Sequence, residues 1–188
     1  MEPLKPQKAF YHLDENHIFE PVSYGAVALH QIGRLYAGEA TAILPHMHLG
    51  WFELTMVTTG HGSVTTNETN YEVKAGDIVL SLPAEKHAIS IDPKNPLRYD
   101  FFSFSAADDT YRTVLKELAQ NARQSRRVFQ DERISSLLSL ALGEFFPAPQ
   151  KPNPVLVASL LSAIVSYVIR DFAIQARSSA LPPKADEL

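Results

Sequence analysis

Residues 46–53 have the sequence HMHLGWFE, and Gly60 follows at the end of the next apolar run. His46 and His48 are two positions apart, so both imidazoles project from the same side of an extended segment. Glu53 lies at the start of the strand predicted over residues 52–59, which is rich in β-branched and aromatic residues. Two imidazoles and a nearby carboxylate therefore form a candidate binding site on a β-structure.

A third imidazole follows later in the chain. Residues 77–82 form a predicted strand, the proline of PAEKH at residues 83–87 turns the chain, and His87 begins another strand. Neutral imidazole and carboxylate are ligands that divalent transition metals accept, and four of them would leave coordination positions open. We consider His46, His48, Glu53 and His87 as the polar lining of a ligand pocket, as metal ligands if a metal is present, or as hydrogen-bonded structural residues.

The region around this site consists of short predicted strands separated by Gly, Pro, Asn and Asp. Gly60-His61-Gly62 is interpreted as a tight hairpin, and Ala75-Gly76-Asp77 as a second turn. Many short strands without an intervening helical pattern predict a β-barrel or sandwich. The predicted strands cover residues 24–35, 40–44, 52–59, 63–66, 77–82, 87–91 and 98–105.

After Ser105 the apolar period changes to that of helices. Asp131 and Asn153 are predicted helix N-caps, the latter with Pro154 at the first helical position. The middle apolar stripe could pack on the barrel or pair with a second copy of the chain. Its residues are Ile134, Leu137, Leu138, Ala141, Leu142 and Phe145. The apolar segment at residues 155–169 is interrupted by serines and is too short to cross a bilayer of about 30 Å.

Composition excludes several function classes. The 188 residues carry a formal net charge of −4, which argues against a strongly basic nucleic-acid-binding protein. Four arginines between residues 123 and 133 are interpreted as a solvated turn between helices. There is no cysteine, so thiolate zinc sites and cysteine nucleophiles are excluded.

The spacing His46-x-His48-x4-Glu53-x6-Gly60 resembles the first motif of the cupin superfamily. Residues 76–87 resemble the second motif, although Glu85 stands where glycine is usual. A narrower resemblance includes WFELTMVTTGHGSV, YEVKAGDIVLSLPAEKHAI and LRYDFFSFS, followed by amphipathic helices. In these features, over residues 17–175, the chain is similar to the effector-binding and dimerisation half of AraC-type transcription regulators.

This resemblance implies a mainly β fold, a cupin or jelly-roll barrel followed by about three α-helices. The expected organisation is an arm at residues 1–16, the barrel at 17–105, a helical dimerisation layer at 106–175, and a tail at 176–188 that leads to a DNA-binding domain missing from this chain. An effector, such as a sugar or small acid, is expected inside the barrel. The candidate contact residues are His46, His48, Trp51, Glu53, His87 and Arg34.

From the sequence itself we expect a cytoplasmic protein that does not contact membranes. The resemblance implies a homodimer that binds DNA only through the missing domain and is not an enzyme. It implies no obligatory cofactor; a divalent transition metal is the one candidate. The alternative is a metal-dependent cupin enzyme, a dioxygenase or a sugar isomerase, which would use His46, His48, Glu53 and His87 as metal ligands.

Overall fold

The computed structural model describes residues 10–11, 20–36, 42–92, 94–146 and 151–180. Strands make up most of the first half of this part of the chain, and helices dominate after residue 108. The strands are β1 (Phe10–Tyr11), β2 (Val22–Tyr24), β3 (Val27–Tyr36), β4 (Ile43–His46), β5 (Phe52–Thr59), β6 (His61–Thr66), β7 (Thr69–Lys74), β8 (Ile78–Ser81), β9 (His87–Ile91), β10 (Arg98–Ala106) and β11 (Val128–Phe129). The helices are α2 (Asp109–Arg123), α3 (Glu132–Phe145) and α4 (Pro154–Ala180).

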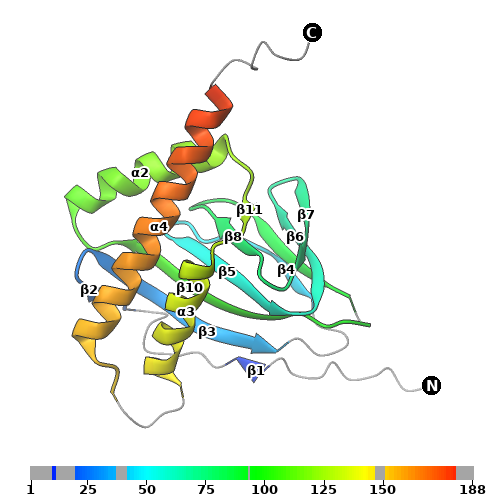
Figure 1. Cartoon of the computed structure of the whole chain (residues 1–188), viewed down its shortest axis with the longest axis horizontal. Coiled ribbons are helices and arrows are strands. Elements are labelled where there is room, and N and C mark those ends of the chain that lie inside the picture. Colours follow the sequence, from blue (N-terminus) through cyan, green and yellow to red (C-terminus); the bar gives the residue numbers. More distant parts are fainter. Residues whose placement is uncertain (1–9, 12–19, 37–41, 93, 147–150, 181–188) are drawn as a thin grey trace.

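The strands form two antiparallel sheets. The larger has the order β1-β3-β10-β5-β8-β11, with β2 also paired to β3, and the smaller has the order β4-β9-β6-β7. One face of the larger sheet packs on the smaller sheet, and the other face is covered by α2, α3 and α4 (Figure 1). The predicted fold class, a jelly-roll barrel followed by C-terminal helices, is confirmed.

Strand β5 shows how the sequence builds both layers. Its first six residues are all buried, because the strand lies between the smaller sheet and the helices. Phe52, Leu54 and Met56 belong to the core under the helices. Glu53 and Thr55 alternate with them and point to the other face, where they meet the smaller sheet. One face of this buried strand therefore packs under the helices, and the other face carries residues of the candidate site.

The helices begin where the sequence predicts. Asp131 caps α3 by accepting a hydrogen bond from the backbone N–H of Arg133 at 2.8 Å. The side-chain oxygen of Asn153 accepts from the N–H groups of Val155 and Leu156 at 3.1 and 3.2 Å, which fixes the start of α4 at Pro154. Both predicted N-caps are confirmed.

Helix α4 is longer than the apolar segment predicted for it, since it continues to Ala180 through part of the expected tail. Residues Pro154–Arg177 are long and apolar enough to cross a membrane by length and composition alone, which corrects the prediction that this segment is too short. Much of this apolar character is used in the protein's own core. The buried side chains of α4 are Val157, Leu160, Leu161, Ile164, Val165, Val168 and Phe172.

The interpretation of Gly60-His61-Gly62 as a tight hairpin is wrong. Strand β5 pairs with β10 and β8, whereas β6 pairs with β7 and β9, so the chain crosses from one sheet to the other at Gly60. Gly60 has a φ of +77°, and a Cβ there would collide with the backbone of Pro96. The glycine is needed for a crossing between sheets and not for a hairpin.

Four of the described strands were not predicted: β1, β2, β7 and β11. The short β11 follows α2 and pairs with β8, so the segment after the first helix returns to the edge of the larger sheet. Most of the expected N-terminal arm and residues 181–188 lie outside the described residues. The described part of the arm is β1, which pairs with β3 at the sheet edge.

Candidate functional site

The structure brings four predicted site residues together between the two sheets. His46, at the end of β4, is directly opposite His87, the first residue of β9, and their ring centroids are 4.2 Å apart. His48 lies in the loop before β5, with its ring 5.0 Å from that of His46 and 5.3 Å from that of His87. Each imidazole offers a nitrogen within 4.8 Å of the other two. We call His46, His48, His87 and Glu53 the histidine cluster.

Glu53 is the buried anion of this cluster. Its carboxylate oxygens lie 3.3 Å from His48 Nε2 and 3.6 Å from His87 Nε2, and it accepts a hydrogen bond from Ser103 Oγ at 3.2 Å. Burial alone raises the pKa of Glu53, but the two imidazoles outweigh it and hold this pKa far below its usual value. Burial lowers the pKa of His87, but Glu53 and Glu85 together outweigh it, so the net shift of this pKa is upward.

Backbone carbonyls fix the orientation of two imidazoles. His46 Nδ1 is 2.9 Å from the carbonyl oxygen of Leu44, and His87 Nδ1 is 3.2 Å from that of Glu85. With Nδ1 as the donor in each pair, the Nε2 lone pair is available to a ligand. The buried Nε2 atoms of His48 and His87 have no well-aligned hydrogen-bond partner in the described part of the chain. The three imidazole nitrogens, which lie within 4.8 Å of one another, fit a divalent transition metal, and Glu53 lies beside two of them.

The hollow beside the cluster is small, at about 200 Å³. Besides His46, His48 and Glu53, its lining is Gln31, Ile43, Ile89, Tyr99 and Phe101. The walls are mainly apolar, and Gln31 adds one amide. Since pockets for drug-sized ligands are about 300–1,000 Å³, this space suits a molecule of only a few heavy atoms.

Trp51, Arg34 and His87, three predicted contact residues, do not line this hollow, although His87 belongs to the histidine cluster. The indole of Trp51 stacks on the rings of His30 and His48, with centroid distances of 4.4 and 5.0 Å. Arg34 forms two hydrogen bonds with Asp100, at 2.5 and 2.8 Å. Asp100 alternates along β10 with Tyr99 and Phe101, which face the hollow, so the Arg34–Asp100 pair lies on the opposite face of the sheet.

A buried ion pair that the sequence analysis missed supports the turn before His87. Glu85 receives two hydrogen bonds from the guanidinium of Arg127, at 2.8 and 2.9 Å, and another from the backbone N–H of Leu82 at 2.9 Å. Arg127 also donates to the carbonyl oxygens of Ala122 and Leu80. One feature of the sequence could have indicated this ion pair: Glu85 stands where cupins usually have glycine. The pair joins the end of α2 to the turn that positions His87.

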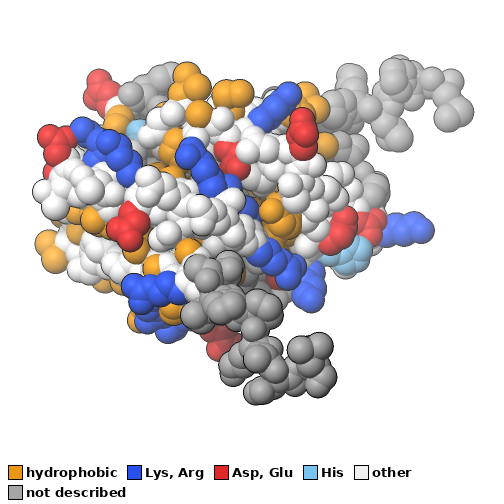
Figure 2. Space-filling view, turned by 90° about the horizontal axis from the view of Figure 1, so that it is seen from above, with side chains coloured by type: hydrophobic (Ala, Val, Ile, Leu, Met, Phe, Trp, Pro, Cys, Tyr) orange, Lys and Arg blue, Asp and Glu red, His pale blue; other side chains and the backbone are white. Residues whose placement is uncertain are grey.

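The interpretation of the arginines between residues 123 and 133 as a solvated turn is therefore wrong for Arg127, which is buried. Arg133 pairs with Asp131 and lies over the ring of Tyr167, 4.5 Å from its centroid. On the face seen in Figure 2, basic side chains are interspersed with acidic and apolar ones and do not gather into one field.

The apolar stripe of α3 packs inside the chain. Ile134, Leu138, Ala141, Leu142 and Phe145 are buried in the core under the helices, and Leu137 is partly buried against it. The prediction that this stripe pairs with a second copy is not supported for these residues, because their surfaces already contact α4 and the sheet. An interface between two copies would need other residues, such as the exposed Leu140 on the outer face of α3.

The sequence was also compared with known proteins. Residues 34–165 match the family described as "AraC-like ligand binding domain". No curated protein matches the chain.

Many solved structures are similar to the chain, and three of them serve as examples. A cupin protein from Bacteroides fragilis is 18% identical, with a TM-score of 0.39 over 57% of this chain and 86% of that one. A conserved protein with a double-stranded β-helix domain from Klebsiella pneumoniae is 14% identical, with a TM-score of 0.41 over 57% and 90%. A predicted oxalate decarboxylase from Thermotoga maritima is 17% identical, with a TM-score of 0.36 over 53% and 94%.

Proposed function

The chain belongs to the AraC-like ligand-binding domain family, and from this premise we propose that it is the small-molecule-sensing domain of a cytoplasmic transcription regulator. In this proposal an effector binds in the hollow beside the histidine cluster. The domain then passes the signal to a DNA-binding domain of the same regulator, which functions as a homodimer.

The observation that carries the proposal is the cluster of three imidazoles and one buried carboxylate beside a hollow with apolar walls. His46, His48 and Glu53 line the hollow, and His87 packs against His46 and Glu53. Imidazoles can donate to or accept from an effector, and the apolar walls exclude water from these contacts. The volume of about 200 Å³ favours a small acid or a small polyol over a larger sugar.

Two structural links could carry the signal to the helices. Glu53 lines the hollow and accepts a hydrogen bond from Ser103, while their neighbours Phe52, Phe102 and Phe104 pack under the helices. A shift of β5 or β10 therefore reaches both layers. The Glu85–Arg127 pair is the second link, because it joins the turn before His87 to the end of α2. An effector changes the helical layer only if it binds two arrangements unequally, typically by about 1–3 kcal/mol.

Isothermal titration calorimetry with a panel of small acids, polyols and sugars tests this proposal. At least one compound should bind, and His48→Ala should weaken its binding about tenfold or more through the loss of a hydrogen bond. His61→Ala is the matched control, because His61 is a half-exposed histidine beside Asp92, away from the hollow. Failure of every compound to bind, or equal weakening by both substitutions, would contradict the proposal.

A metal-dependent cupin enzyme, a dioxygenase or a sugar isomerase, is the second candidate. The observation that favours it is the orientation of His46 and His87 by carbonyl oxygens, which leaves Nε2 of each ring free to ligate. A bound divalent metal would supply Lewis-acid chemistry to an oxygen of the substrate. The chain itself would hold the substrate in the hollow, and Glu53 would keep negative charge beside His48 and His87.

Elemental analysis of protein purified without added metal separates the two candidates. Stoichiometric iron or manganese that is lost in His48→Ala but kept in His61→Ala would favour the enzyme, provided that substrate turnover accompanies it. Effector binding by metal-free protein would favour the sensor.

A further inference from the structure

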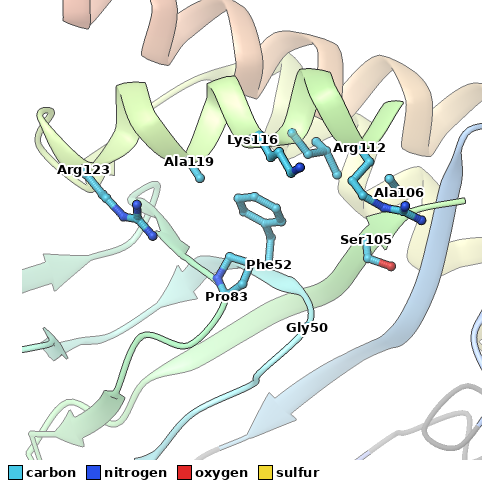
Figure 3. Close-up of a pocket in the computed structure, with 10 residues that line it drawn as sticks. Gly50, Phe52, Pro83, Ser105, Ala106, Arg112, Lys116, Ala119 and Arg123 are labelled. Atoms are coloured by element: carbon cyan, nitrogen blue, oxygen red, sulfur yellow. The ribbon is translucent and has the colours of Figure 1, made fainter. Parts of the chain in front are cut away.

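A second cavity lies under helix α2, outside the histidine cluster. Its volume is about 440 Å³, which is more than twice that of the hollow and within the usual range for ligand pockets. The loop before β5, the turn at Pro83 and the end of β10 form one side, and α2 forms the other (Figure 3). We call this cavity the α2 cleft.

The α2 cleft combines an apolar lining with positive charge. Phe52, Pro83, Leu115 and Ala119 contribute apolar surface. The basic residues of the lining, Arg112, Lys116 and Arg123, follow one side of α2 and extend from it toward the barrel in Figure 3. An apolar cavity with a cationic edge is complementary to a molecule with an apolar body and an anionic head.

Little within the described residues neutralises this charge. None of the residues that line the α2 cleft is acidic. Arg112 pairs with Asp109, but both side chains are largely exposed, so water screens the pair. Lys116 and Arg123 form no ion pair with another described residue. Their charges are therefore available to an anion.

A stack of three rings, His30, Trp51 and His48, connects the edge of the α2 cleft with the histidine cluster. Ser105, in the lining of the α2 cleft, lies 2.8 Å from His30 Nε2 through its hydroxyl oxygen. His30 stacks on Trp51, which also stacks on His48 of the histidine cluster. Gly50 and Phe52, the chain neighbours of Trp51, line the α2 cleft. Trp51 is the only tryptophan, so tryptophan fluorescence reports on this ring stack.

We propose that the α2 cleft is a second ligand site, which takes a small amphipathic monocarboxylate. The apolar chain of the ligand lies on Phe52, Leu115 and Ala119, and its carboxylate pairs with Lys116 and Arg123. Charge-assisted hydrogen bonds to these cations supply the preference for an anion. This site is separate from the one in the proposed function and does not depend on whether the hollow binds an effector.

Octanoate is the probe, and 1-octanol is the matched neutral compound. Octanoate should change Trp51 fluorescence in a saturable manner, and calorimetry should give the same affinity. We expect 1-octanol to bind at least tenfold more weakly, because it lacks the charge that Lys116 and Arg123 would pair with. High salt should weaken octanoate more than 1-octanol, since ions screen only the charged contact.

Variants of α2 locate the site. Lys116→Gln combined with Arg123→Gln should weaken octanoate about tenfold or more, whereas Arg126→Gln, an exposed arginine beyond the helix, should leave it unchanged. Ala119→Leu keeps helix propensity and should abolish binding by filling the cavity. Thermal melts show whether Ala119→Leu is folded, and the double glutamine variant concerns exposed side chains that folding does not need.

Three results would overturn the proposal. The first is equal affinity for octanoate and 1-octanol, and the second is unchanged octanoate binding in the double glutamine variant. The third is octanoate binding that survives Ala119→Leu but is lost in His48→Ala. That third result would place octanoate in the hollow, so it would contradict the α2 cleft while supporting the proposed function.

Discussion

The two faces of the larger sheet use the same strands for different purposes. On the helix side, Phe52, Leu54, Phe102 and Phe104 form a core of aromatic and aliphatic side chains, with Phe102 and Phe104 stacked at 5.0 Å. On the other side, the intervening residues include the buried Glu53, Thr55 and Ser103. One residue along a strand therefore separates a side chain that packs from one that belongs to the candidate site.

This difference has an energetic meaning. Apolar burial stabilises in proportion to area, whereas a buried carboxylate costs free energy unless hydrogen bonds and opposite charge compensate it. The helix side therefore supplies the stability that lets the other side keep Glu53 and three imidazoles together. The contrast predicts that matched substitutions on the two faces have very different effects on stability.

The largest expected effect comes from Phe102→Ala. Phe102 is fully buried on the helix side, so its truncation should lower the free energy of unfolding by about 3–5 kcal/mol. Ser103→Ala, one residue further on the other face, removes a hydrogen bond to Glu53 and should cost about 1 kcal/mol. Urea denaturation measures both. Equal losses of unfolding free energy in the two variants would show that the helix side does not contribute more to stability than the side of the candidate site.

A smaller loss is expected from Arg127→Met, which tests the link between the two sides. It leaves the carboxylate of Glu85 buried with its donors at Leu82 and Asn67 but without its cation, and we expect destabilisation by about 3 kcal/mol. Glu85→Gln together with Arg127→Met should lose much less than the sum of the single variants. A double variant whose loss equals that sum would mean that the two side chains act independently.

The sequence was sufficient for the fold class and for most of the histidine cluster, because these depend largely on short-range patterns. His46, His48 and Glu53 are close in sequence, although His48 lies in the loop between β4 and β5 and not on a strand. His87 was added because a strand was predicted to begin there and because residues 76–87 resemble the second cupin motif. The helices follow from apolar periodicity and from the N-caps Asp131 and Asn153, both present in the structure.

The remaining features depend on contacts between distant segments. Arg127 is buried because β11 brings it to Glu85, which is 42 residues away, and a two-residue strand has no periodic signal. Arg34 was chosen as a ligand contact because it lies in a strand, but its partner Asp100 is set by the register of β3 and β10. The stripe of α3 was left open between the barrel and a second copy, because periodicity shows that a face is apolar without showing what covers it.

The smallest effect that we predict lies at the edge of the helix side, where Asp131 caps α3. Hydrogen bonds from Arg133 lower the pKa of Asp131 to about 2, and the ordinary value for an unfolded aspartate is about 3.9. A depressed carboxyl pKa stabilises the folded state above the unfolded value, and this contribution is lost as pH falls from about 4 toward 2. The pKa of the neighbouring Asp171 is raised by burial and by Asp131, so its titration partly offsets the loss.

Asp131→Asn should therefore reduce the stability at pH 6 by only a few tenths of a kcal/mol, because asparagine is an equally good N-cap. It should also flatten the loss of stability between pH 4 and pH 2, measured by urea denaturation at a series of pH values. Asp109→Asn is the matched control, since Asp109 also precedes an arginine partner on its helix but is highly exposed. If Asp109→Asn flattened the acid limb as much as Asp131→Asn, the acid sensitivity would belong to the general charge of the molecule and not to the cap that holds α3 against the apolar face.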